Sequence, residues 1–535
     1  GGDRSHHVTG ILDFGDMVFG YRVGDLAIAI AYAMLGDDNP LAVAAHMVRG
    51  YSQHVQLGSE ELSALFGLIA LRLCTSVCIA ADQLRQQPEN EYLGISQSAI
   101  GQLLPALAAI PFGLAEAVFR DASGMVPVPA SERVVRYLET AQHVSPVLGV
   151  DLSAERVMVL DLSVASPMVD GDERRNAEPF LTERVFGAMR DAGVRISIGR
   201  YDEPRLLYVS PLFATGPRVT DEHRTIHIGL DLFAVAGTPV YAPLGGVVHA
   251  FNDNNAIQDY GPVIILAHAT DDGTPFYTLY GHLSRESLAG LVVGQRITAG
   301  QQIATMGTAE VNVGWTPHLH LQIITDLLGL ETDFPGVARP SQRKIWTALC
   351  PDPNLLARVP ASRFPAEPPS TAETLAERRS TIGGNLSIAY RDPVKLVRGW
   401  KQYLYDEDGR RYVDAYNNVP HVGHCHPRVV EAGAAQMRVL NTNTRYLNDR
   451  LAEYADRLLA TLPPELDVCY FVNSASEANE LALRLTRAYT GRRDMIVLDA
   501  AYHGNTTSLI DISPYKHAGP GGSGAPDWVH VAPLP

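Results

Sequence analysis

The sequence predicts a multidomain protein in which an α-helical region, an antiparallel all-β region and an α/β region follow one another. Apolar residues recur at helical spacing over residues 1–125. Short alternating runs, broken by Gly and Pro, fill residues 205–335, and strand, glycine turn and helix alternate over residues 381–535. A length of 535 residues exceeds what one hydrophobic core usually supports, so about three domains are expected.

Composition and charge indicate a globular protein that does not bind nucleic acid. Apolar residues make up 46% of the chain and charged residues 19%, which are ordinary values for soluble proteins. The net charge of −16 opposes binding to a polyanion. No apolar run approaches the roughly 20 residues that a membrane span needs, so we expect no membrane partner.

The five cysteines show no paired spacing, as expected for a reducing compartment such as the cytoplasm. Cys74 and Cys78 lie one helical turn apart, and we interpret them as small core residues rather than half of a metal site. The chain opens with GGDRSHH, without Met, and closes with VHVAPLP, so we interpret it as a fragment of a longer fusion protein.

The helical region opens with ILDFGD, which places Asp13 at the end of an apolar strand beside a glycine. Such a carboxylate is suited to hold Mg²⁺ on nucleotide phosphates. The stretch VTGILDFGDMVFGYRVGDLA resembles the C-terminal lobe of aminoglycoside-phosphotransferase-like kinases, including the choline and hydroxylysine kinase types. The resemblance implies that Asp13 binds the Mg²⁺ of ATP and that Asp25 anchors the next helix. It also implies that the catalytic Asp and Asn precede residue 1, and an ordinary acidic turn is the alternative.

Two segments of different composition flank the β region. Residues 126–204 begin with the helix-breaking GMVPVPASE and predict a mixed α/β connecting segment. Residues 336–380 include RVPASRFPAEPPSTAE and predict a Pro-rich, solvated linker.

The β region contains TPHLHLQI, in which His318 and His320 are two residues apart in an apolar run. Residues i and i+2 of a strand point to the same face, so the two imidazoles are expected side by side. Buried polar side chains need partners. The motif HIGLD supplies two candidates, His227 and Asp231, and YGHL supplies His282.

A catalytic zinc site takes three N or O ligands and leaves one position open. His227, Asp231 and one histidine of the HLH pair can supply these ligands, which leaves the other histidines to handle protons. The motifs, with GTPVYAPLGGVV and GQRITAGQQIATMG between them, resemble the lysostaphin-type zinc endopeptidases. The resemblance implies that His227, Asp231 and His320 bind Zn²⁺ and that His282 and His318 form the catalytic pair. It further implies polarisation of a peptide carbonyl and activation of water.

The α/β region begins with a charged stretch, YLYDEDGRRYV, that predicts a hairpin with Asp408 and Gly409 at its turn. VNSASEANELALRLTRAYTG then places small residues ahead of an amphipathic helix, whose first N–H groups form a ready phosphate site. DAAYHGNTTS adds Tyr502 after an apolar run, where its ring is suited to stack on a flat cofactor.

These stretches resemble class III aminotransferases, which are pyridoxal phosphate (PLP) enzymes of fold type I. SASEAN, YHGNT and DISPYK are closest to the branch of ethanolamine-phosphate and phosphohydroxylysine phospho-lyases. The resemblance implies that Ala475 and Ser476 hold the PLP phosphate and that Tyr502 stacks on the pyridine. Glu477 and His503 would line the site. The family commonly has Gly at the position of Ala475.

Two further features of this region follow from the resemblance. The Schiff-base lysine of the family lies farther downstream, and Lys516 has the wrong context for it. His421, His424 and His426 in PHVGHCHP are interpreted as the family's loop near the active-site entrance rather than as metal ligands.

The sequence therefore predicts a multifunctional enzyme that joins an amino-alcohol kinase, a zinc metallopeptidase-like domain and a class III aminotransferase or phospho-lyase. The kinase would phosphorylate an amino alcohol, and the PLP enzyme would eliminate that phosphate or act on the amine. The dependence on ATP and PLP favours the cytoplasm, and class III relatives predict a homodimer for the full-length protein. The partners are a small amino substrate and a peptide. As the alternative, the middle domain is a non-catalytic binding or spacer module and the protein is mainly a PLP-dependent transaminase.

Overall fold

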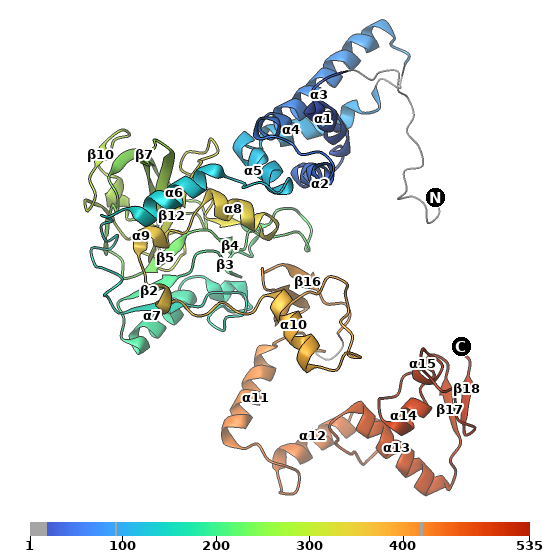
Figure 1. Cartoon of the computed structure of the whole chain (residues 1–535). Coiled ribbons are helices and arrows are strands. Elements are labelled where there is room, and N and C mark those ends of the chain that lie inside the picture. Colours follow the sequence, from blue (N-terminus) through green and yellow to red (C-terminus); the bar gives the residue numbers. More distant parts are fainter. Residues whose placement is uncertain (1–18, 91–93, 418–420, 535) are drawn as a thin grey trace. The chain divides into compact units, whose positions relative to one another are not determined.

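A computed structural model describes residues 19–90, 94–417 and 421–534 (Figure 1). The motif ILDFGD, and with it the predicted Mg²⁺ ligand Asp13, lies outside these residues. The chain divides into two compact units, Gly1–Val429 and Val430–Pro535, and each is described by itself.

The predicted helical region is confirmed for the residues that the structure describes. Its helices bury one face each, as on α1, where Leu26 and Ile30 are buried at helical spacing. Asp25 is exposed in the first turn of α1, where a carboxylate favours the positive end of the helix dipole. The helices are α1 (Arg22–Ala33), α2 (Pro40–Ser52), α3 (Ser59–Gln86), α4 (Gln97–Ala108) and α5 (Phe112–Ala122).

Helix α3 corrects two of the sequence predictions. It contains an 18-residue window with a mean hydropathy of 2.1 and 28% of its residues buried, and it is long and apolar enough to cross a membrane. Helices α4 and α5 are together also long and apolar enough, but the chain bends by 99° between them. The prediction that no apolar run approaches this length was therefore wrong. Cys74 and Cys78 are both exposed on α3, so their prediction as core residues was also wrong.

An antiparallel sheet forms the centre of the β region, as predicted. Its strand order is β1-β2-β5-β12-β9-β8-β7-β10, and every neighbouring pair is antiparallel except the parallel pair β1 and β2. The HLH motif begins β12, near the middle of the sheet. The strands are β1 (Val157–Leu160), β2 (Ile196–Gly199), β5 (Leu230–Phe233), β7 (Gly246–Asn254), β8 (Gly261–Ala269), β9 (Pro275–Gly281), β10 (Arg296–Ile297) and β12 (His318–Ile324).

Two smaller sheets complete the β region. One has the order β13-β4-β3 and carries His227 at the end of β4. The other pairs β11 with β6. Their strands are β3 (Glu203–Pro204), β4 (Ile226–His227), β6 (Pro239–Tyr241), β11 (Gln302–Thr305) and β13 (Val337–Ala338).

The predicted connecting segment, residues 126–204, belongs to the β domain rather than lying between domains. It supplies β1 and β2 to the main sheet, with α7 (Phe180–Ala192) between them. It also supplies α6 (Pro129–Thr140), whose Val134 and Leu138 share one buried cluster with Leu232 of β5. A parallel pair requires a crossover connection, and that requirement explains the helix between β1 and β2.

The predicted Pro-rich linker, residues 336–380, is folded in its first half. Helices α8 (Arg343–Leu349) and α9 (Asn354–Ala357) follow β13, and Trp346 and Leu349 are buried. In the second half, α10 (Thr371–Thr381) buries none of its residues. Tertiary packing thus extends to about residue 360, although the composition of the segment favours a solvated chain.

The predicted hairpin is confirmed by β15 (Tyr403–Asp406) and β16 (Arg411–Val413), which follow β14 (Leu396–Trp400). Gly409 in its turn has φ +80°, a conformation that favours glycine. The hairpin is fastened to the β domain, because the Asp408 carbonyl accepts a hydrogen bond of 2.6 Å from Thr225 Oγ1 and the Asp408 carboxylate pairs with Arg343 at 3.0 Å.

The second unit shows the predicted alternation of strands and helices. Its core is small and is formed by Leu483, Val497, Leu509, Ile512, Trp528 and Val529. Strands β17 and β18 are parallel. The elements are α12 (Asp449–Leu459), α13 (Ala475–Thr490), β17 (Met495–Leu498), α14 (Thr507–Asp511), α15 (Pro514–His517) and β18 (Val529–Ala532), and α11 (Pro427–Val439) crosses the boundary between the units.

Ile198→Ala tests whether β2 is part of the β domain. Ile198 is fully buried, so the cavity left by its truncation is expected to lower the free energy of unfolding by about 2–5 kcal/mol. Urea unfolding followed by tryptophan fluorescence measures the change. Val293→Ala, at a position that is 63% exposed, is the control and is expected to change stability by less than about 0.5 kcal/mol. Equal stability of the two variants would contradict this domain assignment.

Candidate functional site

Three of the predicted ligands meet in the β domain. His227 Nε2, Asp231 Oδ1 and His320 Nδ1 lie 3.1 Å from one another. The corners of a tetrahedron around a zinc ion with ordinary bond lengths are about 3.3 Å apart, so the three atoms have the spacing of a zinc site. Among residues 19–90, 94–417 and 421–534, no other group of three or more His, Cys, Asp or Glu side chains converges in this way.

The pairing of strands explains this convergence. His320 of β12 lies directly opposite Asp231 of β5, so the imidazole and the carboxylate are neighbours on one face of the sheet. Gly229, between β4 and β5, has no side chain to obstruct them. A Cβ atom there would lie 2.3 Å from His320 Cε1, and the glycine of HIGLD is therefore needed to admit the His320 ring.

The electrostatics of the ligands suit a metal. Burial opposes ionisation of Asp231, but the attraction of His227 and Arg205 outweighs it and holds the pKa of this carboxyl well below its usual range. Burial, followed by the charge of Arg205, lowers the pKa of His227 to about 4. Near neutral pH the site thus offers an anionic oxygen and a neutral imidazole, which are the protonation states that bind metals.

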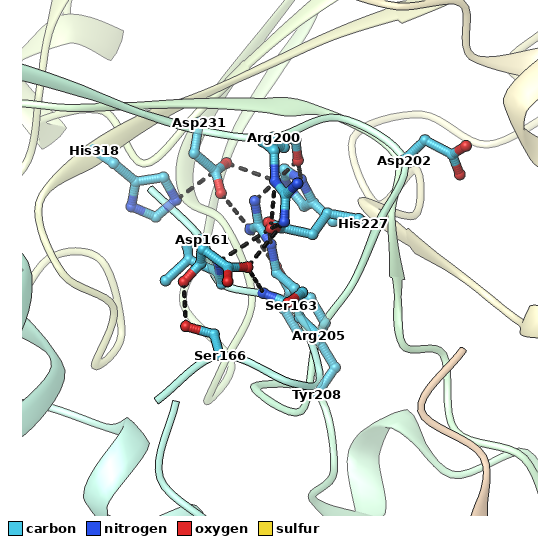
Figure 2. Close-up of polar contacts among 12 residues, drawn as sticks. Asp161, Ser163, Ser166, Arg200, Asp202, Arg205, Tyr208, His227, Asp231 and His318 are labelled. Atoms are coloured by element: carbon cyan, nitrogen blue, oxygen red, sulfur yellow. Dashed lines mark hydrogen bonds and ion pairs between the residues drawn. The ribbon is translucent and has the colours of Figure 1, made fainter. Parts of the chain in front are cut away.

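The predicted catalytic pair lies beside the ligands. The His282 and His318 rings are stacked at an angle with their centroids 4.2 Å apart. His318 Nδ1 donates to the Thr316 carbonyl at 2.6 Å, which leaves Nε2 as an acceptor, 3.6 Å from Asp231 Oδ1. Figure 2 shows Asp231 with contacts to His318 on one side and to Arg205 and His227 on the other.

His282 has two unusual features. Its φ is +63°, a conformation that residues with a side chain rarely adopt and that concentrates at functional sites. Its Nδ1 atom is buried and has no hydrogen-bond partner within the described part of the chain. Burial and the neighbouring His318 hold the pKa of His282 well below its usual range, and burial also lowers the pKa of His318. Both imidazoles are therefore neutral bases.

All five side chains line one cavity of about 280 Å³. Most of its remaining wall is apolar or aromatic, and the aromatic members are Tyr208, Phe213, Phe233, Tyr260, Trp315 and Phe334. The Tyr208 ring is stacked on the ring of His227 with centroids 6.3 Å apart. Sequence reasoning missed Tyr208 and Arg205. The only signal was a charged residue at the head of the apolar run LLYV.

The predicted PLP-phosphate residues lie at the start of α13. The Ser474 side chain accepts a hydrogen bond from Glu477 N and caps the helix, so Ala475 and Ser476 occupy its first positions. Ser476 Oγ accepts from Asn505 N at 3.2 Å. Asn479 Nδ2 donates to the His503 carbonyl at 2.7 Å. These bonds hold the YHGN loop against the N-terminus of α13.

The glycine of that loop also fits a close approach. Gly504 has φ +146°, and a Cβ atom there would lie 2.7 Å from Ser476 Oγ. Tyr502, two residues earlier, is 54% exposed, so its ring is free to contact a flat cofactor. Ser476 and Tyr502 thus fit the roles that the resemblance implies. The Glu477 carboxylate instead accepts a hydrogen bond of 2.7 Å from Asn473 N, within the helix cap.

The remaining candidate residues of the α/β region are His503, Lys516 and the histidines of PHVGHCHP. His503 Nε2 is buried and lacks a partner among the described residues. The Lys516 ammonium lies 5.8 Å from the centroid of the Tyr502 ring. His424 Nε2 contacts Asp414 Oδ2 at 2.7 Å, and neither His421 nor His426 joins it in a metal-binding group within the part that the structure describes.

Comparisons with protein families agree with this geometry. Peptidase family M23 matches residues 225–330, which contain both ligand motifs and both histidines of the predicted catalytic pair. Aminotransferase class-III matches residues 389–524. Residues 225–330 are an M23 peptidase domain. Residues 389–524 are a class III aminotransferase portion.

Several similar proteins have names of aminotransferases or phospho-lyases. The chain is 54% identical over 167 residues to an "Alanine--glyoxylate aminotransferase 2-like" protein of Drosophila melanogaster, covering 31% of this chain and 34% of that one. It is 46% identical over 178 residues to "Ethanolamine-phosphate phospho-lyase homolog 1" of Caenorhabditis elegans, covering 33% and 38%. A solved phospholyase from Arthrobacter in complex with phosphoethanolamine is 42% identical, covers 30% and 38%, and has a TM-score of 0.29. The chain thus spans about a third of the length of the curated relatives it matches.

His227→Ala is expected to remove zinc from the protein, because two ligands hold the ion far more weakly than three. Zinc retained after desalting, measured by atomic absorption, is expected to fall from about one ion per chain to near zero. His249→Ala is the matched control, since His249 is an exposed histidine on β7 outside the ligand group. Equal zinc content in the two variants would disprove the ligand assignment.

Proposed function

We propose that the M23 domain is a zinc-dependent peptide hydrolase. The observation that carries the proposal is the triangle of His227, Asp231 and His320 atoms, 3.1 Å on each side, beside two buried neutral histidines. When bound by these three residues, zinc supplies a Lewis acid that polarises a carbonyl and makes water acidic.

The two other histidines supply the proton chemistry. His318 is held by its hydrogen bond to the Thr316 carbonyl in the tautomer that leaves Nε2 unprotonated. That nitrogen faces the site, so it can accept a proton from the attacking water. His282 lines the same cavity and has a buried Nδ1 without a partner among the described residues, which supports a role for this ring in hydrogen-bonding the substrate. The strained backbone at His282 keeps its ring against His318.

His282→Ala and His320→Ala are both expected to abolish peptide hydrolysis. Loss of a general acid–base residue costs about 10²–10⁴-fold in rate, and loss of a ligand removes the metal. The measurement is release of new amino termini from a mixed peptide library by the zinc-loaded protein. His249→Ala is expected to keep full activity. Hydrolysis by both variants at the wild-type rate would refute the proposal.

A non-catalytic binding or spacer module is the rival interpretation of the M23 domain. It predicts zinc-free protein and unchanged behaviour after substitution of every motif residue. The buried, unpartnered Nδ1 of His282 favours the enzyme, because a buried polar atom without a partner costs free energy that a spacer has no reason to bear.

A second activity is proposed for the class III portion of the full-length protein. We propose that it binds PLP and eliminates phosphate from a phosphorylated amino alcohol, with transamination of an amine as the alternative. The identities of 46% to the worm phospho-lyase homolog and 42% to the Arthrobacter phospholyase support this substrate class. Release of inorganic phosphate from phosphoethanolamine supports elimination, and turnover of a keto acid supports transamination.

The remaining predictions about the full-length protein are proposals of the same kind. Its homodimeric state and cytoplasmic location rest on the class III resemblance and on the need for PLP. The amino-alcohol kinase rests on the resemblance of residues 1–125, whose predicted Mg²⁺ ligand lies outside the described residues. ATP-dependent phosphorylation of an amino alcohol by the full-length protein tests it.

Tyr502→Ala is expected to weaken PLP binding by the full-length protein. Loss of one aromatic stacking contact, about 0.5–1.5 kcal/mol, corresponds to a rise in Kd of about 2- to 12-fold. Absorbance of protein-bound PLP during titration measures it. Tyr489→Ala, at a tyrosine on α13 that is 93% exposed, is the control. Equal affinities of the two variants would remove Tyr502 from the cofactor site.

A further inference from the structure

Arg205 is a charged side chain buried in the core of the β domain. It is 1% exposed and is the largest fully buried side chain of the described residues. Its Nε donates to Glu203 Oε2 at 2.7 Å, and its Nη1 donates to Asp231 Oδ2 at 2.6 Å and to the Tyr208 hydroxyl at 3.3 Å. Its Nη2 donates to the Arg200 carbonyl at 3.0 Å. A buried guanidinium is expected to be paired in this way.

The two carboxylate oxygens of Asp231 have different partners. Oδ1 faces the histidine ligands at 3.1 Å, whereas Oδ2 accepts the hydrogen bond from Arg205. A carboxylate held by one oxygen cannot turn about its Cβ–Cγ bond, so the other oxygen has one orientation. Figure 2 shows the guanidinium of Arg205 beside this carboxylate.

Glu203 makes the buried arginine possible. Its carboxylate is 3% exposed and binds Arg205 through Oε2, while Oε1 accepts from Arg200 Nε at 2.7 Å and from Leu162 N at 3.0 Å. A buried cation is costly unless its charge is balanced. Glu203 and Asp231 flank Arg205, so the positive charge is compensated on both sides and does not repel a metal.

The backbone near Arg205 leaves room for its guanidinium and also contacts a second metal ligand. Gly199 lies opposite Asp231 in the pairing of β2 with β5, and a Cβ atom at Gly199 would lie 2.9 Å from Arg205 Nη2 and 3.1 Å from Asp231 Cβ. The next residue, Arg200, accepts a hydrogen bond of 2.9 Å from His227 Nδ1, which leaves His227 Nε2 for the metal. Residues 199–205 thus contact two of the three ligands, although they precede the M23 match at residue 225.

We infer that Arg205, held by Glu203, is a positioning residue that orients the Asp231 carboxylate for metal binding. The inference rests on the proposed zinc site. Partners that hold ligating carboxylates and histidines from behind typically contribute 10–100-fold to metal affinity. Here the partner, Arg205, directly follows β3 and precedes residue 225, so the M23 match alone does not contain the complete metal site.

Arg205→Lys separates geometry from charge. The single ammonium of lysine keeps the positive charge but cannot reach Glu203, Asp231 and the Arg200 carbonyl together. Zinc affinity of the whole chain, measured by competition with a chromophoric chelator, is expected to fall about 10- to 100-fold. Arg195→Lys is the matched control, because Arg195 lies just before β2 in an exposed pair with Glu155, and its variant is expected to bind zinc as the wild type does.

Glu203→Gln provides the second variant and acts through the partner. It leaves Arg205 in place but removes one balancing negative charge. The net positive charge beside the metal site therefore rises, and zinc affinity is expected to fall. The melting temperature of the metal-free protein is measured alongside. A lowered melting temperature with wild-type zinc affinity would show a structural role only and would overturn the inference, as would unchanged affinity in folded Arg205→Lys.

The wild-type protein separates this inference from the proposed function. Zinc binding without peptide hydrolysis would defeat the hydrolase and leave Arg205 as a positioning residue if its variants bind zinc weakly. Hydrolysis by the wild type together with full zinc affinity in both variants would defeat the inference alone. A wild-type chain that binds no zinc would defeat both.

Discussion

The antiparallel pairing of β5 with β12 is the interaction on which the metal site depends. It sets Asp231 opposite His320 in the middle of the main sheet, where both side chains are almost fully buried. If β12 slipped by one residue, His320 would turn to the face opposite Asp231, so the residues that fix the register also preserve the metal site. Leu319 and Leu321 of β12 are fully buried and secure that register.

Around this pair, the site is completed by residues 200–205, which belong to none of the strands that carry the ligands. Arg200, between β2 and β3, contacts His227 through its carbonyl, and Arg205, directly after β3, contacts Asp231 through its guanidinium. The same segment contains Asp202, whose carboxylate pairs with Arg343 at 2.7 Å. Arg343 in turn pairs with Asp408 of the class III hairpin. Residues 200–205 therefore contact two metal ligands and, through Asp202, the arginine that pairs with the class III hairpin.

Local patterns in the sequence predicted the parts of the fold that depend on local spacing. The i and i+2 spacing of His318 and His320 predicted a strand with both rings on one face, and the Asp408–Gly409 turn predicted a hairpin. The ligand set followed from the resemblance, and its glycine has a steric reason in the close approach of Gly229 to His320. The helical region followed from its 3.6-residue period.

The features that were missed depend on contacts between distant segments. Strands β1 and β2 are four residues each and joined by a helix, so nothing local shows that they extend the main sheet. The exposure of Cys74 and Cys78 depends on which face of α3 its neighbours cover, and the apolar sequence of α3 does not distinguish the faces. Arg205 was missed because its partners lie up to 26 residues away and its burial appears only in three dimensions.

The claim at the centre of this account is that zinc is held by two imidazole nitrogens and one carboxylate oxygen. X-ray absorption at the zinc edge of the zinc-loaded protein tests it most directly. The predicted spectrum shows N and O neighbours at about 2.0–2.1 Å, with the multiple-scattering pattern of two histidines and no sulfur. A spectrum that shows sulfur ligands at about 2.3 Å, or oxygen neighbours without histidine scattering, would contradict the account.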